Sequence, residues 1–465
     1  MEELRRLLPE LQFYPHSVQQ FEGATLALAK LGEEKVLVVA GRKPPKLSGR
    51  VRKVDGKRIW ICPTDSRNAR ALRSLFPFLR PKPSWLRPSV GFGDRLGLST
   101  PGHLRAAKSL QVYPILAQQS ARELGKTGRG FREVLECAVW GVFQEGYTGG
   151  FGSDADHLST LGEIREAVRA GFTGFTLDVS PYLDYSEKNL LAKVSRWSSP
   201  TELERDYRRF EIIPGFELAF EKEEVWRLGA RFARALNFVQ KAWKLLSAEV
   251  GEFDFEISLD ETQEPTAPKE HFFFVRELKL RGIRITSFAP RFVGKFEKAV
   301  DYKGDLDKLR ENLRQHYLIA QHLGPYKLSI HSGSDKPSVY PLLAEFGPVH
   351  IKTSGTTYLQ ALEVVQKHDP KLFSRICALA EKVFEKERKA YAGLVGEARE
   401  ASLEGEGRQV LHVTYGPVLR RLGREIRRIL IQHEEEFSSK LEQHFSALSP
   451  AFRREAGVSF KPEKI

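Results

Sequence analysis

The chain has 465 residues, of which 41% are apolar and 29% charged, and its 73 Lys and Arg outnumber its 60 Asp and Glu to give a net charge of +13. A chain of this length and composition can bury a large core, which excludes a disulfide-stapled miniprotein and a disordered chain. The three cysteines, Cys62, Cys137 and Cys377, lack paired spacing. This argues against a zinc ribbon or a disulfide framework and favours a reducing compartment.

No stretch reaches the roughly 18 continuous apolar residues that a membrane helix needs. The start, MEELRRLLPEL, has neither the basic region nor the apolar run of a signal peptide. We therefore expect a soluble, cytoplasmic protein with no membrane partner. One methionine and four asparagines among many charged residues resemble the composition of thermophile proteins.

Residues 1–85 carry a disproportionate share of the charge. Here 17 Lys and Arg face 8 Asp and Glu, a net +9, which leaves 56 minus 52, or +4, for the remaining residues. Short apolar runs alternate with turn signals, and Val54-Asp55-Gly56-Lys57 predicts a tight turn between two strands. We predict a small basic α/β domain over residues 1–85, leaving through the linker PKPSWLRP (81–88). A basic surface favours solubility and an anionic substrate, and nucleic-acid binding is the alternative.

Beyond the linker, short strand-like runs recur, and amphipathic stretches such as GFREVLECAVWGVFQEG (130–146) with helical spacing lie between them. There are eight runs: 89–97, 114–120, 149–157, 174–180, 253–261, 283–291, 326–336 and 349–355. Eight strand-then-helix units predict an α/β fold, a (β/α)₈ TIM-type barrel over residues 86–368. The fourth crossover is long and predicts a helical insertion at about 185–250. Residues 369–465 are expected to form a helical C-terminal extension packed on the barrel.

In such barrels the active site lies at the C-terminal ends of the strands. Polar residues end three of the runs: Asp154-Ala-Asp156-His157 the third, Asp260-Glu261 the fifth and His331 the seventh. Imidazoles and carboxylates from several strands form a ligand set for a divalent metal that keeps positions open to substrate. We expect His157, His271 and His331 as metal ligands. His271 lies at the start of the helix after the fifth run, and Asp260 is the alternative third ligand.

Asp156 and Glu261 are the predicted acid/base pair. Two carboxylates from separate strands can stand on opposite faces of a substrate, as a stereochemical inversion requires. The alternative for Asp156 is that it orients a metal-bound imidazole. The substrate is predicted to be anionic or polyhydroxylated and to be held by side chains at or near the strand ends. Cationic side chains there can pair with a carboxylate of the substrate, and amides and a hydroxyl can bond to its hydroxyl groups. These side chains are Arg95, Gln118, Gln119, Arg291, Ser332, Lys336 and Lys352.

Other familiar motifs do not fit. Gly91-Phe-Gly93-Asp-Arg-Leu-Gly97 has its third glycine one place late for a dinucleotide fingerprint. There is no P-loop and no G-x-S-x-G elbow. Aromatic runs such as HFFF (271–274) belong to apolar helix faces rather than to a platform for stacking bases.

Several long motifs in order resemble the tagaturonate epimerase family of metal-dependent hexuronate epimerases. They are GFGDRLGLSTPGH (91–103), ILAQQSARE (115–123), DADHL (154–158), FTLDVS (175–180), EISLDETQEPTAPKEHFFF (256–274), RFVGKFEKAVDYKGDL (291–306), GPYKLSIHSGSDK (324–336) and IKTSGTTYL (351–359). The resemblance implies interconversion of D-tagaturonate and D-fructuronate in hexuronate breakdown. It also implies a divalent metal near His157 and His331 and acid/base chemistry near Asp156 and Glu261. The metal could be zinc, manganese, nickel or cobalt.

The chemistry can be narrowed further. The inverted carbon is two bonds from the ketone carbon, so its hydrogen is not acidified by a neighbouring carbonyl. A nicotinamide could oxidise and re-reduce this carbon, but a dinucleotide fingerprint is not found. We therefore favour a retro-aldol cleavage and re-addition assisted by a Lewis-acid metal. The alternative enzyme is a metal-dependent aldolase or a ketohexose epimerase on the same barrel. The alternative of another class is a nucleic-acid-binding protein. The protein could form a homo-oligomer, and the sequence leaves the oligomeric state open.

Overall fold

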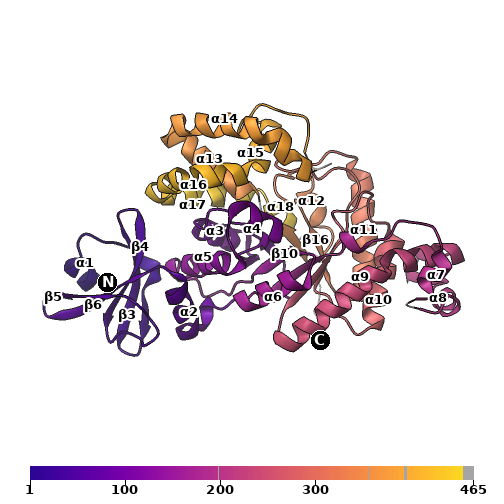
Figure 1. Ribbon diagram of the computed structural model, residues 1–465, viewed down its shortest axis with the longest axis horizontal. Helices are drawn as coiled ribbons and strands as arrows, with labels where there is room; N and C mark the ends of the chain where they lie inside the picture. Colours follow the sequence, from indigo (N-terminus) through magenta and orange to yellow (C-terminus); the bar gives the residue numbers. More distant parts are fainter. Residues whose placement is uncertain (197, 354, 392–394, 454–465) are drawn as a thin grey trace.

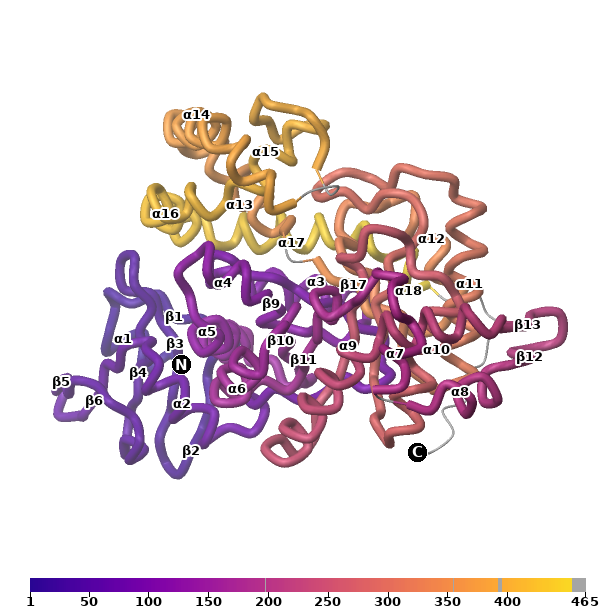
Figure 2. The backbone as a smooth tube through the Cα atoms, turned by 45° about the vertical axis from the view of Figure 1, so that its right-hand side comes forward, coloured from indigo at the N-terminus to yellow at the C-terminus, as the bar shows by residue number. Residues whose placement is uncertain are grey.

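The computed structural model describes residues 1–453 except 197, 354 and 392–394, and it has an α/β fold (Figures 1 and 2). Its centre is a nine-stranded parallel sheet, here called the central sheet. The strands are β7 (Ser89–Gly91), β8 (Tyr113–Ile115), β9 (Gln119–Ser120), β10 (Asp154–Leu158), β11 (Gly174–Asp178), β14 (Asp254–Ser258), β15 (Ser287–Ala289), β16 (Lys327–Ile330) and β17 (Val349–Lys352). Each of the eight predicted runs contributes to this sheet.

The two ends of the central sheet lie close to each other. The strand order is β8-β7-β17-β16-β15-β14-β11-β10-β9, and the terminal strands β8 and β9 are separated along the chain only by residues 116–118. Ile115 also forms a parallel bridge with Gly152, just before β10. This arrangement is consistent with the predicted TIM-type barrel.

Helices surround the central sheet, so that strands such as β11 are buried along their whole length. They are α3 (Thr100–Leu110), α4 (Ala121–Thr127), α5 (Phe131–Gln144), α6 (Leu161–Ala170), α10 (Pro268–Leu280), α11 (Leu306–Leu323), α12 (Tyr340–Leu343) and α13 (Thr356–His368). Local sequence sets their ends. In α6, Thr160 and Glu163 form a capping box, and Gly171 ends the helix at a φ of 92°.

The N-terminal part forms a six-stranded antiparallel sheet, which lies at one end of the molecule (Figure 1). Its elements are α1 (Glu2–Leu7), β1 (Gln12–Phe13), η1 (Pro15–Ser17), β2 (Gln19–Phe21), β3 (Ala24–Leu31), β4 (Glu34–Gly41), β5 (Arg50–Val54), β6 (Lys57–Pro63), α2 (Ser66–Leu75) and η2 (Pro77–Leu79). The predicted tight turn is confirmed: Val54 pairs with Lys57, and Asp55 and Gly56 both have positive φ. Positive φ at both central positions matches the twist of the flanking strands.

The long crossover between β11 and β14 holds more than the predicted helices. It contains η3 (Ser180–Tyr182), α7 (Leu190–Val194), α8 (Pro200–Asp206), β12 (Arg209–Ile213), β13 (Phe216–Ala219) and α9 (Lys222–Glu249). The two strands form an antiparallel hairpin. Pro214-Gly215 makes the turn, with Gly215 at a φ of 85°. Alternation of polar and apolar residues around this turn signals a hairpin, and the sequence analysis did not use it.

The C-terminal extension is helical in its described residues and covers one side of the helical layer (Figure 1). It comprises α14 (Pro370–Glu387), η4 (Arg388–Tyr391), α15 (Gly407–Val413), α16 (Tyr415–Gln432), α17 (Glu434–Ser446) and α18 (Ser449–Phe452). Helices α16 and α17 pack on α3, α4 and α13. The approach is close at Gly102, where an added Cβ would meet Leu441 at 2.8 Å. Residues 454–465 of the predicted extension lie outside the described residues.

Cys62, Cys137 and Cys377 are free thiols. Within the described residues, the helices are too short or too polar for any of them to span a bilayer.

Candidate active site

The ends of β10 and β16 bring His157 and His331 together, with their ring centroids 5.0 Å apart. Asp260, just after β14, lies between them: its Oδ1 is 3.3 Å from His157 Nε2 and 3.1 Å from His331 Nδ1. Both nitrogens are buried and lack a well-aligned hydrogen bond. With Asp156 and Glu261, these residues form what we call the rim cluster.

A carboxylate behind His331 fixes the direction of its ring. His331 Nε2 lies 2.7 Å from Glu256 Oε1, and Glu256 also accepts a hydrogen bond from the Ser287 hydroxyl. A proton on Nε2 therefore satisfies Glu256, and Nδ1 is turned toward Asp260. Burial opposes a charge on His331, but Asp260 and Glu256 outweigh it and raise its pKa above the ordinary value. Imidazole ligands of metals are commonly oriented by such a carboxylate.

Lys352 joins three carboxylates beneath the histidines. Its Nζ lies 2.8 Å from Asp154 Oδ2, 2.7 Å from Asp156 Oδ1 and 2.9 Å from Glu256 Oε1. All four groups are buried. Even so, His157 and Lys352 hold the pKa of Asp156 well below its usual range, and Lys352 and His331 do the same for Glu256. The carboxylates in turn hold the pKa of Lys352 well above its own. For Asp154, burial prevails and raises the pKa to about 6. The Lys352 ammonium is therefore paired with protein carboxylates in this structure.

The donor set of the rim cluster fits a divalent cation. Asp156, His157 and His331 each offer a ligand atom, and these atoms lie within 4.8 Å of one another. Despite burial, Asp156 and Asp260 raise the pKa of His157 well above its ordinary value, which reflects more negative than positive charge around the ring. Nitrogen and carboxylate ligands suit zinc and similar metals. His157 also has a φ of 52°, a strained conformation of the kind that concentrates at functional sites.

The two predicted acid/base residues have different surroundings. The Asp156 side chain is only 6% exposed, and its oxygens are bonded to Lys352 and to Gln118 Nε2 at 2.7 Å. Glu261 is 26% exposed, lies 3.6 Å from His157 Nε2 and forms an ion pair with Arg122. Glu261 is therefore the carboxylate that a molecule arriving at the rim can reach.

Of the predicted substrate residues, Gln118, Ser332 and Arg291 lie at the rim. Gln118 contacts the rim cluster through Asp156. Ser332 follows His331 and accepts a hydrogen bond from Lys298. Arg291 donates to the carbonyl of Thr262, the residue after Glu261.

The remaining predicted substrate residues turn into the protein. Arg95 is 4% exposed, with its Nε 2.9 Å from Glu123 Oε1 and its guanidinium 3.6 Å from the ring centroid of Tyr415. Gln119 also bonds to Glu123, at 2.9 Å. Lys336 donates to three backbone carbonyls, those of Glu297, Val300 and Ser334. The charges of Arg95 and Lys336 are thus already neutralised or solvated by protein groups.

His271 does not join the rim cluster, which corrects its predicted placement. Its Nδ1 lies 2.9 Å from His316 Nδ1, its Nε2 lies 2.7 Å from the Tyr326 hydroxyl, and its ring stacks on Phe288 at 4.1 Å. Burial and the neighbouring His316 hold its pKa well below the ordinary value. The physical reason is helical periodicity: residue 271 belongs to the inner face of α10, which packs against the central sheet rather than over its edge.

Several residues of this site had no predicted role. They are Asp154, which was noted only as part of a polar strand end, Thr176 and Glu256 within strands, and Arg122 and Lys298 in the segments beyond them. A signal existed for the strand residues. Asp154 and Asp156, like Glu256, Ser258 and Asp260, are two apart, so they share one face of a strand. Charged residues at this spacing inside an otherwise apolar strand indicate a polar interior.

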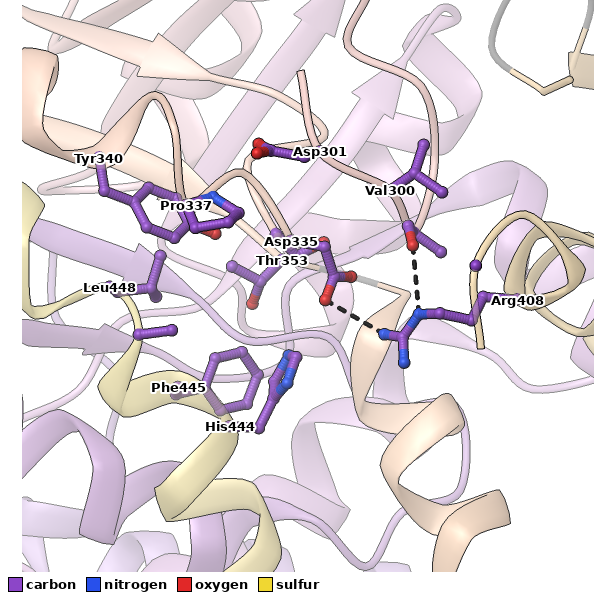
Figure 3. Close-up of a pocket in the computed structure, with 14 residues that line it drawn as sticks. Val300, Asp301, Asp335, Pro337, Tyr340, Thr353, Arg408, His444, Phe445 and Leu448 are labelled. Atoms are coloured by element: carbon purple, nitrogen blue, oxygen red, sulfur yellow. Dashed lines mark hydrogen bonds and ion pairs between the residues drawn. The ribbon is translucent and has the colours of Figure 1, made fainter. Parts of the chain in front are cut away.

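A separate cavity of about 410 Å³ opens between the loop after β16 and the C-terminal extension. Figure 3 shows Arg408 directed at Asp335, 3.1 Å away, with His444 and Phe445 on the wall contributed by α17. None of the predicted site residues, all of which the structure describes, lines this cavity. It is therefore distinct from the rim cluster.

Comparison with known proteins agrees with this arrangement. The family model described as tagaturonate epimerase matches residues 14–448. A tagaturonate/fructuronate epimerase from Thermotoga maritima is 38% identical over 458 residues, covering 93% of this chain and 95% of the relative. The chain belongs to the tagaturonate epimerase family. The resemblance found in the sequence, and the epimerase activity it implied, are thereby confirmed.

Solved structures extend the likeness to the fold. The native crystal structure of fructuronate-tagaturonate epimerase from Cohnella laeviribosi has a TM-score of 0.89 at 34% identity, covering 97% of this chain and 98% of that one. A form of that enzyme complexed with two glycerols has a TM-score of 0.89 at 33% identity, covering 98% of this chain and 100% of that one.

Proposed function

We propose that this chain interconverts D-tagaturonate and D-fructuronate at the rim cluster, with a divalent cation such as zinc, manganese, nickel or cobalt. The observation that carries the proposal is the convergence of His157, His331 and Asp260 at the strand ends of a member of the tagaturonate epimerase family. We take the central sheet to close as a (β/α)₈ barrel, whose active sites lie at this edge. The domain limits at residues 85 and 368, the cytoplasmic location and the thermophilic source stay predictions.

His157, His331 and Asp260 would hold the cation. Asp260 is favoured over Asp156 as the carboxylate ligand because its Oδ1 faces a buried nitrogen of each imidazole that lacks a well-aligned hydrogen bond. Asp156 is instead engaged by Lys352 and Gln118. With Oδ1 2.9 Å from His157 Nδ1, Asp156 is suited to orient that ring, which is the alternative role predicted for it.

Glu261 is the proposed base. It would take the proton from the hydroxyl on the carbon to be inverted, and the adjacent carbon–carbon bond would break as that hydroxyl becomes an aldehyde. The bonding electrons pass toward the ketone oxygen, leaving an enediolate. A bound divalent cation supplies Lewis-acid stabilisation of that negative charge. Rotation of the aldehyde and re-addition at its other face return the proton from Glu261 and invert the centre.

Cations close to Glu261 would hold the uronate carboxylate. Arg122 forms an ion pair with Glu261 and is 40% exposed, so it can reorient toward a second carboxylate. Arg291 donates a hydrogen bond to the carbonyl of Thr262, the residue after Glu261. A guanidinium fork matches a carboxylate bidentately, which would favour uronates over neutral ketohexoses at this site.

The test is conversion of D-tagaturonate by the purified protein in heavy water. We expect fructuronate without deuterium at the inverted carbon, loss of activity to a chelator and recovery on adding a divalent ion. The protein should contain no stoichiometric nicotinamide, because hydride transfer would also exclude deuterium. Deuterium at the inverted carbon would refute the retro-aldol step, and chelator-resistant activity would refute the metal.

A further inference from the structure

A second group of metal-type ligands lies where the C-terminal extension meets the last helix around the central sheet. It consists of His368, the final residue of α13, His433, between α16 and α17, and Glu436 in the first turn of α17. His368 Nε2 lies 2.7 Å from Glu436 Oε2. The two imidazoles stack with centroids 3.5 Å apart and planes 13° from parallel.

We propose that His368, His433 and Glu436 bind a divalent transition-metal ion of the zinc class, separately from the rim cluster. One ligand atom from each residue lies within 4.8 Å of the others. Two imidazoles and one carboxylate suit zinc, nickel or cobalt, whereas magnesium and calcium prefer oxygen ligands throughout. A fourth position would be left to water.

The ligand side chains have to rearrange to bind an ion. His368 Nε2 and Glu436 Oε2, now 2.7 Å apart, have to separate, and the stacked imidazoles have to rotate so that a nitrogen of each faces the same ion. In a tetrahedral zinc site the ligand nitrogens and oxygens stand about 3.4 Å apart. The side chains of His368 and Glu436 are 23% and 30% exposed, so they have room to adjust.

Neighbouring cations set a limit on the affinity. Lys367 pairs with the other oxygen of Glu436, Oε1, at 2.9 Å, and Lys30 donates to the carbonyl of Ile431 at 2.6 Å. Both ammonium groups oppose a bound cation. The buried carboxylates Asp154, Asp156 and Glu256 lie in or next to the rim cluster, so we expect this second site to bind a cation more weakly than the rim cluster does.

The position suggests what the metal would do. Helix α13 starts just after β17, at the rim, and runs away from it, so that His368 lies at the end of the helix remote from the rim cluster. Residues close to His433 contact the N-terminal sheet: Glu434 pairs with Lys35 and accepts a hydrogen bond from the Tyr14 hydroxyl at 2.6 Å. A metal here would tie α13 to α17 beside the N-terminal sheet and stabilise the folded chain.

Zinc content per chain is the decisive measurement. The protein is stripped with a chelator, loaded with Zn²⁺, freed of excess ion and analysed for metal. We expect two ions per chain for the wild type, one for His433→Ala or Glu436→Gln, one for His331→Ala and none for the His331→Ala/His433→Ala variant. His16→Ala, which removes an exposed histidine elsewhere, should keep two.

Thermal unfolding supplies the second readout. Zn²⁺ should raise the Tm of His331→Ala, in which only the second site remains, and should lose this effect when His433→Ala is added. Because Glu436→Gln preserves the shape of the side chain, it tests the second site even if His433→Ala fails to fold. Equal zinc content in the wild type, His433→Ala and Glu436→Gln would overturn the second site. A wild type that holds one ion, lost in His433→Ala but kept in His331→Ala, would instead support it and refute the metal of the proposed function.

Discussion

Two pairs of histidines in this molecule have opposite electrostatic surroundings. His157 and His331 lie at strand ends among carboxylates, which raise the pKa of both rings despite burial. His271 and His316 lie between helices and the central sheet with neutral partners, each other and Tyr326. Burial lowers the pKa of both of these rings. The surroundings of the first pair thus favour a bound cation, whereas those of the second pair favour neutral imidazoles.

The difference comes from where the side chains emerge. A residue at the C-terminal end of a strand faces the open edge of the sheet, where carboxylates from several strands converge. A residue on the inner face of a helix meets apolar side chains, where an unpaired charge is costly. Charge balance, rather than burial alone, therefore separates the rim cluster from the pair in the core.

The largest expected effect comes from removing the cation beneath the rim. Lys352→Met should reduce the free energy of unfolding at pH 7 by about 3–5 kcal/mol, because it leaves buried carboxylates without their partner. Denaturant unfolding measures this change. Lys193→Met, which removes a surface ion pair with Asp184, is the control and should cost less than about 1 kcal/mol.

The pH dependence of the same variant has a defined sign. In the wild type, the lowered pKa values of Asp156 and Glu256 contribute stability above the unfolded-state pKa of about 4, and this contribution is lost as the pH falls. Without Lys352, burial is less opposed and the pKa of both carboxylates moves upward. The deficit of Lys352→Met should therefore shrink from pH 7 to pH 5. A deficit that is equal at both pH values would mean that Lys352 acts through packing.

Next in size is the division of roles between two aspartates of the rim cluster. Asp260→Asn should lower kcat by about 100-fold or more, or about 2.7 kcal/mol, and weaken metal binding. Asp156→Asn should cost about 10–100-fold, as expected when an orienting carboxylate is lost. Steady-state kinetics and metal titration measure both effects. His271→Phe is the matched control from the core pair and should keep the metal. The assignment of the carboxylate ligand is wrong if Asp156→Asn weakens metal binding more than Asp260→Asn does.

The sequence predicted much of the fold because strand and helix periodicities are local. All eight runs supply strands, and the turn at Asp55-Gly56 forms as expected. The hairpin β12–β13 was missed because a short pair of strands inside a helical crossover gives a weak signal beside α9.

The contacts that each side chain makes were harder to predict than the helices and strands. His157 and His331 could be placed together because topology alone brings their strand ends to one edge. Arg95, Lys336 and Lys352 were predicted to bind substrate, but the sequence alone does not show which protein groups engage a cation near a strand end. Arg95 is paired with Glu123 and Lys336 with backbone carbonyls, partners that depend on packing distant in sequence.

The smallest expected effect is the pH dependence of stability that comes from the core pair, His271 and His316. Its sign is opposite to that of a histidine whose pKa is raised by carboxylates. His316 has its pKa lowered to about 4 by burial, below the unfolded value of about 6.5. Its contribution to stability is therefore present above pH 6.5 and is lost as the pH falls, by about 2 kcal/mol at pH 5. The variant His271→Phe/His316→Leu should lose correspondingly less stability than the wild type between pH 7 and pH 5. Denaturant unfolding at the two pH values measures this. His16→Ala should follow the wild type, and a double variant that also follows it would show that the core pair does not titrate on unfolding.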